Sequence, residues 1–197
     1  MLAVYLLEKM NLKINKVSFF PVNVFECTID ESYCDSVIEL VEKEKLSWGK
    51  DLKNVKALTT GWNGLRYSIL QDIGNFACSS ILPAIGNSQQ WQYNNWYTKE
   101  AWINFYQKKD YATPHCHYYA DFCAVLIVRE GQGNLNFCNI IDGFQIKKPF
   151  ELETHEKIIE KKGSFIFFPS WLYHYVSEVE KDRITVAFNF ANEAIES

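Results

Sequence analysis

The chain has 197 residues, of which 48% are hydrophobic and 16% aromatic, with a formal net charge of −4 and only 9 Gly and 5 Pro. This composition provides for a sizeable core and excludes wholesale disorder and the fibrous or low-complexity classes. The acidic balance offers no broad basic surface, so we expect neither long nucleic acid nor an anionic membrane as a partner. We expect a single domain over residues 1–197, with a more helical part at 1–95 and the chemistry within 96–190.

Targeting signals are not expected. The apolar start, Met1–Leu7, is interrupted by Glu8 and Lys9 and carries no preceding positive charge, which argues against a signal peptide. The apolar runs are far shorter than the roughly 18 residues that span a bilayer. The six cysteines form no CxxC pair, which is typical of reduced, buried thiols, so we expect a cytoplasmic location.

Two helices are predicted in the first half of the chain. The first covers residues 34–44, where apolar residues recur on one face and Asp30 or Ser32 can supply the cap. The second covers residues 70–85, with Pro83 near its end. Residues 47–63 between them are polar, and we predict no element there. Both helices are expected to support packing rather than chemistry.

From residue 96 onward the pattern changes to short strands separated by turns. The segment 122–128 is a continuous apolar run, typical of a strand buried on both faces. Further strands are predicted over 101–106, 135–138, 164–168, 172–176 and 183–190. Many short strands at this spacing predict a mainly β fold with supporting helices (α+β), built as an antiparallel jelly roll. The polar segment 142–162 is predicted to be an exposed excursion without function.

Three of the 4 histidines have a pattern that suits a metal site. His115 and His117 form an H-x-H pair, and residues two apart on a strand point to the same face. His174 follows 57 residues after His117, directly after a predicted strand and turn. Two ligands from one strand and a third from a distant strand would form a facial set with open positions for substrate and oxidant. An H-x-H pair alone is more often two polar, partly buried side chains.

A candidate carboxylate clamp follows His174. Nine positions on, Arg183 and Thr185 face the same side of a predicted strand. A guanidinium grips a carboxylate through two hydrogen bonds, and a threonine hydroxyl can add another. The pattern suits a co-substrate held by the metal at one end and by Arg183 at the other.

These phrases, in this order, resemble the Fe(II)- and 2-oxoglutarate-dependent oxygenases, in particular those common in phages and marine bacteria. The matching phrases are Ala101–Tyr106, His115–His117, Gly131–Phe137, Gly163–His174 and Arg183–Phe190. The resemblance implies a double-stranded β-helix of the cupin-like jelly-roll type, with Fe(II) at its open end. It also implies 2-oxoglutarate and dioxygen as co-substrates, together with a primary substrate that the sequence does not identify.

The resemblance also assigns roles to residues. His115 and His174 would bind the iron, and Arg183 would pair with the distal carboxylate of 2-oxoglutarate. Thr185 would support that carboxylate, and Asn104 would face the same pocket. The implied reaction is oxidative decarboxylation of 2-oxoglutarate to succinate and CO2, coupled to hydroxylation of the second substrate.

One position departs from the wider superfamily, which has H-x-D or H-x-E where this chain has His117. A neutral third ligand would leave the metal site one negative charge poorer. We favour His117 as the third metal ligand, in a three-histidine site. Two alternatives stay open: Asp121 could supply the carboxylate, or His117 could lie outside the ligand set, with water or halide in its place.

Two other functions are compatible with the sequence. The chain could be a non-catalytic jelly-roll binding module, or a three-histidine cupin-type metalloenzyme that does not use 2-oxoglutarate. Arg183 discriminates between these and the leading hypothesis, because only an enzyme that holds a dicarboxylate needs an Arg–Thr clamp beside the metal.

Overall fold

The computed structural model describes residues 22–89, 95–138 and 160–193. The apolar start Met1–Leu7 and most of the predicted excursion at 142–162 lie outside these ranges. The helices are α2 (Glu31–Glu44), α3 (Ser68–Phe76) and α4 (Leu82–Ser88). The strands are β1 (Phe25–Thr28), β2 (Gly49–Leu52), β3 (Val55–Thr59), β4 (Trp96–Tyr106), β5 (Tyr111–His115), β6 (Phe122–Arg129), β7 (Leu135–Phe137), β8 (Ser164–Pro169), β9 (His174–Val176) and β10 (Arg183–Asn192).

The first predicted helix is confirmed as α2, which begins three residues earlier than predicted. Its cap is Asp30, whose side chain accepts a 2.8 Å hydrogen bond from the backbone N–H of Ser32. The second predicted helix is divided by a π-helical turn, Ala77–Ile81, between α3 and α4. Pro83 therefore lies in the first turn of α4 rather than near the C-terminal end of one long helix. A proline in the first turn carries little penalty, because its missing N–H would have no partner within the helix.

The polar stretch 47–63, for which no element was predicted, contains β2 and β3. In β3 the buried residues Val55, Ala57 and Thr59 alternate with more exposed ones. That alternation is a strand signal which the polar composition of the stretch obscured.

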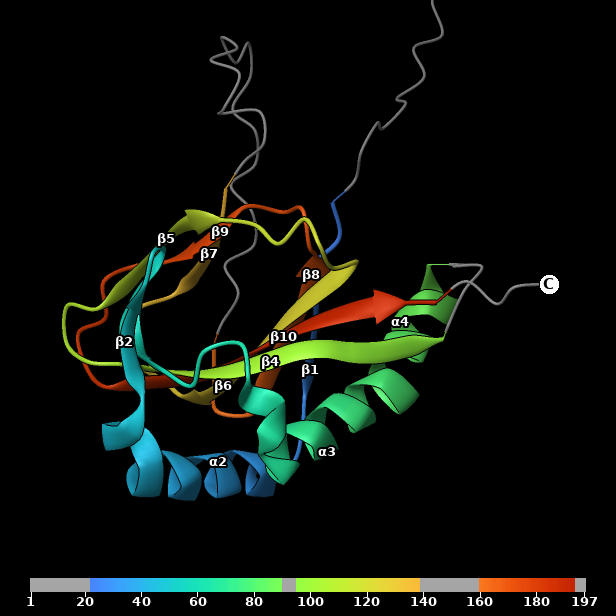
Figure 1. Ribbon diagram of the computed structural model, residues 1–197. Coiled ribbons are helices and arrows are strands. Elements are labelled where there is room, and N and C mark those ends of the chain that lie inside the picture. Colours follow the sequence, from blue (N-terminus) through green and yellow to red (C-terminus); the bar gives the residue numbers. More distant parts are fainter. Residues whose placement is uncertain (1–21, 90–94, 139–159, 194–197) are drawn as a thin grey trace, which may run out of the picture.

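The ten strands join in one sheet in the order β1-β8-β6-β10-β4-β3-β5-β9-β7, with β2 paired to β3 at its side. All the strand pairs are antiparallel. The sheet curls, so that β5, β9 and β7 lie on one side of β10 and β4, whereas α2 and α3 lie on the other (Figure 1). The mainly β fold with supporting helices is confirmed. Among the described residues, no helix is both long and apolar enough to cross a membrane.

Strand β6 is buried on both faces, as predicted, and its alternate residues enter two different cores. Phe122, Ala124, Leu126 and Val128 pack with the residues of the helices. Cys123, Val125 and Ile127 face the inside of the roll, where they pack with residues of β7 and β8. The roll therefore has an outer core under the helices and a separate inner layer.

The same alternation gives the inner face of β10 and β4 its polar residues. In β10, Ile184, Val186, Phe188 and Phe190 join the outer core, so the residues between them point into the roll. The antiparallel register pairs these inner residues with those of β4: Arg183 with Tyr106, Thr185 with Asn104, Ala187 with Trp102 and Asn189 with Glu100. We call these eight residues the inner row.

Candidate metal centre and co-substrate pocket

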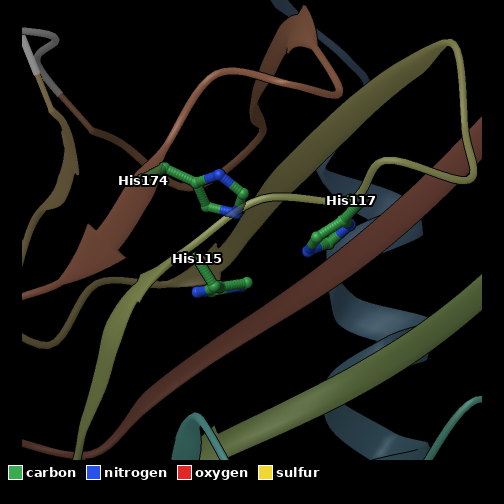
Figure 2. A group of neighbouring side chains, drawn as sticks. All are labelled: His115, His117 and His174. Carbon is green, nitrogen blue, oxygen red and sulfur yellow. The ribbon is translucent and has the colours of Figure 1, made fainter. Parts of the chain in front are cut away.

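The three predicted histidines meet where β5 pairs with β9. His115 ends β5 and His174 begins β9, and the sheet register places them opposite each other. His117 lies two residues beyond β5, yet its ring centroid is 5.1 Å from that of His115 and 5.2 Å from that of His174. One potential ligand atom from each residue lies within 4.8 Å of the other two. Figure 2 shows the three rings gathered around one point.

Backbone oxygen atoms fix the orientation of two of the imidazoles. Nδ1 of His115 lies 2.7 Å from the carbonyl oxygen of Thr113, and Nδ1 of His174 lies 3.0 Å from that of Leu172. A carbonyl only accepts, so both Nδ1 atoms carry the hydrogen and both Nε2 atoms keep a lone pair. Nδ1 of His117 lies 2.7 Å from Oδ1 of Asn189, which serves the third ring in the same way. Metal-binding histidines are held by such contacts.

Burial keeps the three rings neutral. Loss of water lowers the pKa of His174 to about 3, and the nearby His115 adds to this effect, while the Leu172 carbonyl opposes it. The pKa of His115 and that of His117 are also lowered, chiefly by burial. A neutral imidazole is the form that binds a metal, and imidazole ligands suit Fe, Zn, Cu and Ni. The donor set therefore fits a divalent transition metal.

Asp121, the alternative third ligand, is engaged elsewhere. Its carboxylate accepts a 2.8 Å hydrogen bond from the backbone N–H of Asn192, and the residue is exposed. The ligand group that the described residues form at this site consists of three histidines and contains no carboxylate.

A cavity extends from the histidines into the roll along the inner row. Its lining includes Asn104, Thr185 and Tyr106, and both Asn104 and Thr185 are buried. Oδ1 of Asn104 is buried with no hydrogen-bond partner among the described residues. A buried oxygen without a partner is costly, so a donor brought by a bound molecule would be favourable here.

Arg183 continues the inner row beyond Thr185 and is 1% exposed. Its Nη1 donates to the carbonyl oxygen of Gly133 at 2.6 Å and pairs with the carboxylate of Glu160. Its Nε and Nη2 have no hydrogen-bond partner among the described residues. These two atoms form one edge of the planar guanidinium, and such an edge can hold a carboxylate through two hydrogen bonds. Arg183 does not itself line the cavity, so a co-substrate carboxylate that pairs with this edge has to reach past Thr185, which does.

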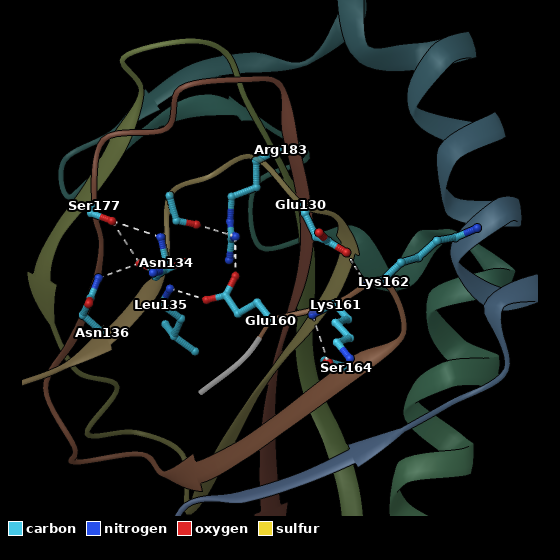
Figure 3. Close-up of polar contacts among 11 residues, drawn as sticks. Glu130, Asn134, Leu135, Asn136, Glu160, Lys161, Lys162, Ser164, Ser177 and Arg183 are labelled. Atoms are coloured by element: carbon cyan, nitrogen blue, oxygen red, sulfur yellow. Dashed lines mark hydrogen bonds and ion pairs between the residues drawn. The ribbon is translucent and has the colours of Figure 1, made fainter. Parts of the chain in front are cut away.

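The position of Glu160 contradicts the expectation that the segment up to residue 162 is exposed and without function. Its side chain is only 4% exposed, because it turns into the roll and accepts from the backbone N–H of Leu135 as well as from Arg183 (Figure 3). A buried guanidinium needs a counter-charge, which explains the inward turn. Sequence reasoning missed Glu160 because nothing in its polar surroundings indicates a buried partner 23 residues ahead.

Two further residues of the site were missed. Asn189 lies six positions after Arg183, on the same strand face, and Glu100 is its partner on β4. The period of two in β10 could have pointed to Asn189. Glu100 required the strand register, which a single sequence does not provide.

Comparisons with known proteins gave one family match and several similar solved structures. Residues 100–189 match the family model described as "Putative 2OG-Fe(II) oxygenase", which confirms the resemblance stated from the sequence. No curated protein matches the chain. Among solved structures, the chain is similar to a prolyl-4-hydroxylase of Pseudomonas putida, with TM-score 0.63 and 11% identity over 87% of this chain and 93% of that one.

Two other solved structures are similar. The viral collagen prolyl hydroxylase of Paramecium Bursaria Chlorella virus-1, in complex with 2-oxoglutarate, has TM-score 0.58 and 14% identity over 85% of this chain and 94% of that one. The non-heme α-ketoglutarate-dependent epimerase SnoN of nogalamycin biosynthesis has TM-score 0.58 and 9% identity over 85% of this chain and 78% of that one. Identities this low show the fold alone, and the predicted jelly roll is confirmed.

Proposed function

We propose that this chain, which has the jelly-roll fold of the 2-oxoglutarate oxygenases and matches their family model over residues 100–189, is an Fe(II)- and 2-oxoglutarate-dependent dioxygenase. Its reaction is the hydroxylation of a primary substrate that is still to be identified, coupled to the conversion of 2-oxoglutarate to succinate and CO2. His115, His117 and His174 hold the metal in this proposal, and the inner row holds the co-substrate.

The observation that carries the proposal is the convergence of three neutral imidazoles on a cavity that Thr185 also lines, two residues along β10 from a buried guanidinium edge without a partner among the described residues. The three Nε2 atoms are the metal ligands, since each Nδ1 already contacts an oxygen atom. Bound Fe(II) would supply the activation of dioxygen by which 2-oxoglutarate is decarboxylated and a C–H bond is hydroxylated. Three protein ligands leave coordination positions for the keto acid and for dioxygen.

The chain's own residues bind and orient 2-oxoglutarate in this proposal. Nε and Nη2 of Arg183 donate to its distal carboxylate, while Glu160 holds the other side of the guanidinium in place. The Thr185 hydroxyl supports the same carboxylate, and Asn104 lines the passage between it and the metal. Burial of these residues excludes water, which strengthens each charge-assisted hydrogen bond.

A second function is supported by the Glu160–Arg183 ion pair. Because the arginine already has a carboxylate partner, the site could be a three-histidine metalloenzyme that takes no dicarboxylate. In that case the guanidinium would serve the fold alone.

The test is anaerobic addition of Fe(II) and then 2-oxoglutarate to the purified protein, followed by the visible charge-transfer band of the chelated keto acid. We expect the band with the unmodified chain, and no band with His174→Ala. Arg183→Met should weaken 2-oxoglutarate binding about 10- to 100-fold, the value of a lost charge-assisted pair. Arg129→Met is the matched control, because Arg129 is partly exposed and its ion pair with Glu42 lies at the surface.

The other outcomes of this test would favour one of the two alternative functions. Fe(II) binding with no band, or a normal band with Arg183→Met, would contradict the proposal and favour the three-histidine enzyme without 2-oxoglutarate. Absence of both metal and keto-acid binding would leave a non-catalytic jelly-roll binding module.

A further inference from the structure

The third imidazole is held differently from the other two. His115 and His174 contact backbone carbonyls, whereas His117 contacts a side-chain amide, that of Asn189. A carbonyl can only accept, but an amide has an oxygen at one end and an NH2 group at the other. The tautomer of His117 therefore depends on which end of Asn189 faces the ring.

Glu100 determines the orientation of this amide. Nδ2 of Asn189 lies 2.9 Å from Oε2 of Glu100 and 3.2 Å from the hydroxyl of Tyr119. A carboxylate accepts and does not donate, so the NH2 group must face Glu100 and Oδ1 must face His117. The thiol of Cys123 lies 3.4 Å from Nδ1 of His117 and 3.2 Å from Oδ1 of Asn189, and it donates to Oδ1 when Nδ1 carries the hydrogen. Asn189 is fully buried and directly opposite Glu100 in the register of β10 and β4, which leaves this chain of contacts little freedom.

The opposite amide orientation would disable the ligand. It would turn the NH2 group toward Nδ1 of His117, which would then have to accept and would leave the hydrogen on Nε2. An imidazole protonated at Nε2 has no lone pair to offer at the point where the three rings meet. Glu100 thus acts on the metal site through one intervening residue.

We infer that Glu100 and Asn189 are positioning residues, which hold His117 in the tautomer that binds metal through Nε2. They also bring a negative charge to a ligand set that has none of its own. The inference deepens the proposed function and rests on it for the identity of the metal. The hydrogen-bond chain from His117 through Asn189 to Glu100 is a property of the chain itself and can be tested without iron.

The first test is the tautomer in the metal-free protein, read from the 15N chemical shifts of the His117 ring. The unmodified chain should show Nδ1 protonated and Nε2 unprotonated. Asn189→Ala and Glu100→Gln should both shift the population toward the Nε2–H form. The double variant Glu100→Gln/Asn189→Asp should restore the original tautomer, because it moves the carboxylate onto His117 while the introduced glutamine amide donates to it. That rescue would not follow from a merely structural role.

The second test is the affinity for Co²⁺, measured by its visible absorption. Loss of such supporting contacts lowers metal affinity about 10- to 100-fold, which we expect for Asn189→Ala, with a smaller loss for Glu100→Gln and recovery in the double variant. Val37→Ala is the control, because Val37 is buried in α2, away from the site, and should lower the melting temperature without changing Co²⁺ affinity.

The outcomes separate this inference from the proposed function. If His117 keeps its Nδ1 hydrogen in Asn189→Ala and in Glu100→Gln, or if the double variant is no better than the single ones, the positioning role is wrong. If the tautomers follow expectation but the unmodified chain binds no divalent metal, the positioning role stands and the proposed function fails.

Discussion

Among the described residues, the polar side chains of the inner row differ in whether they have a hydrogen-bond partner, and those without one lie in the pocket proposed for the co-substrate. Each of the three imidazoles has an oxygen atom at Nδ1. Oδ1 of Asn104 and the Nε–Nη2 edge of Arg183 have none among the described residues. Because an unpaired buried polar group costs about 1–3 kcal/mol, a site that holds two such groups is destabilised until a ligand pairs with them.

Tyr106 gives a prediction of pH dependence at this scale. Burial raises the pKa of its phenol to about 12, while the nearby Arg183 opposes the shift. The unfolded chain ionises tyrosine near pH 10, so the folded state retains its proton through a range in which the unfolded state loses it. This contribution to stability is fully present below about pH 10 and is lost as the pH rises toward 12.

We therefore expect the free energy of unfolding to fall more steeply above pH 10 in the unmodified chain than in Tyr106→Phe, by at most about 3 kcal/mol. Denaturant unfolding at several pH values measures this difference. Equal slopes in the two proteins would show that Tyr106 ionises in the folded state as it does in water.

The individual elements differ in how far the sequence predicted them. Apolar runs of the right length predicted β6, β8 and β10, because both faces of these strands are buried. The period-2 pattern of β10 also placed Arg183 and Thr185 on one face. β3 was missed since it is short and carries Lys56, and the π turn between α3 and α4 has no local signal. Contacts set by the strand register, such as Asn189 with Glu100, cannot be obtained from one sequence.

The turn after β6 is an element in which a glycine is required by close approach. A Cβ atom on Gly131 would lie 2.3 Å from Cβ of Arg183 and 2.7 Å from the backbone oxygen of Lys181. The backbone oxygen of Gly131 also accepts from the N–H groups of Glu180 and Lys181. This turn therefore packs directly against the start of β10, where the guanidinium is held.

Gly131→Ala should lower the free energy of unfolding by about 1–3 kcal/mol, the usual cost of overpacking, and should also weaken 2-oxoglutarate binding because it displaces Arg183. Gly49→Ala is the matched control, since a Cβ there would meet nothing within 4 Å. Denaturant unfolding and the keto-acid titration are the two measurements. An unchanged titration with Gly131→Ala would contradict the idea that this turn positions the arginine.

At the scale of the molecule, the metal ligands join parts of the chain that are far apart in sequence. His115 and His174 are opposite each other only because β5 pairs with β9, and β5 is connected to the rest of the sheet through β3. The helices, by contrast, pack on the outer core and contribute no residue to the three-histidine group. The six cysteines all lie within the described residues and form no disulfide there, and the cytoplasmic location stays a prediction.

This arrangement makes the metal a cross-link between strands, so it should stabilise the whole fold. A ligand that binds only the folded state at 100 times its Kd adds about 2.7 kcal/mol. For a chain of 197 residues we therefore expect Co²⁺ to raise the melting temperature by about 5–10 °C and a chelator to reverse the change.

The shift should be absent in His117→Ala and in His174→Ala. Asp121→Asn should keep it, because the Asp121 carboxylate contacts the backbone of Asn192 and not the metal site. A shift that survives His117→Ala but is lost in Asp121→Asn would instead make Asp121 the third ligand, and the carboxylate would then have to leave Asn192 when the metal binds.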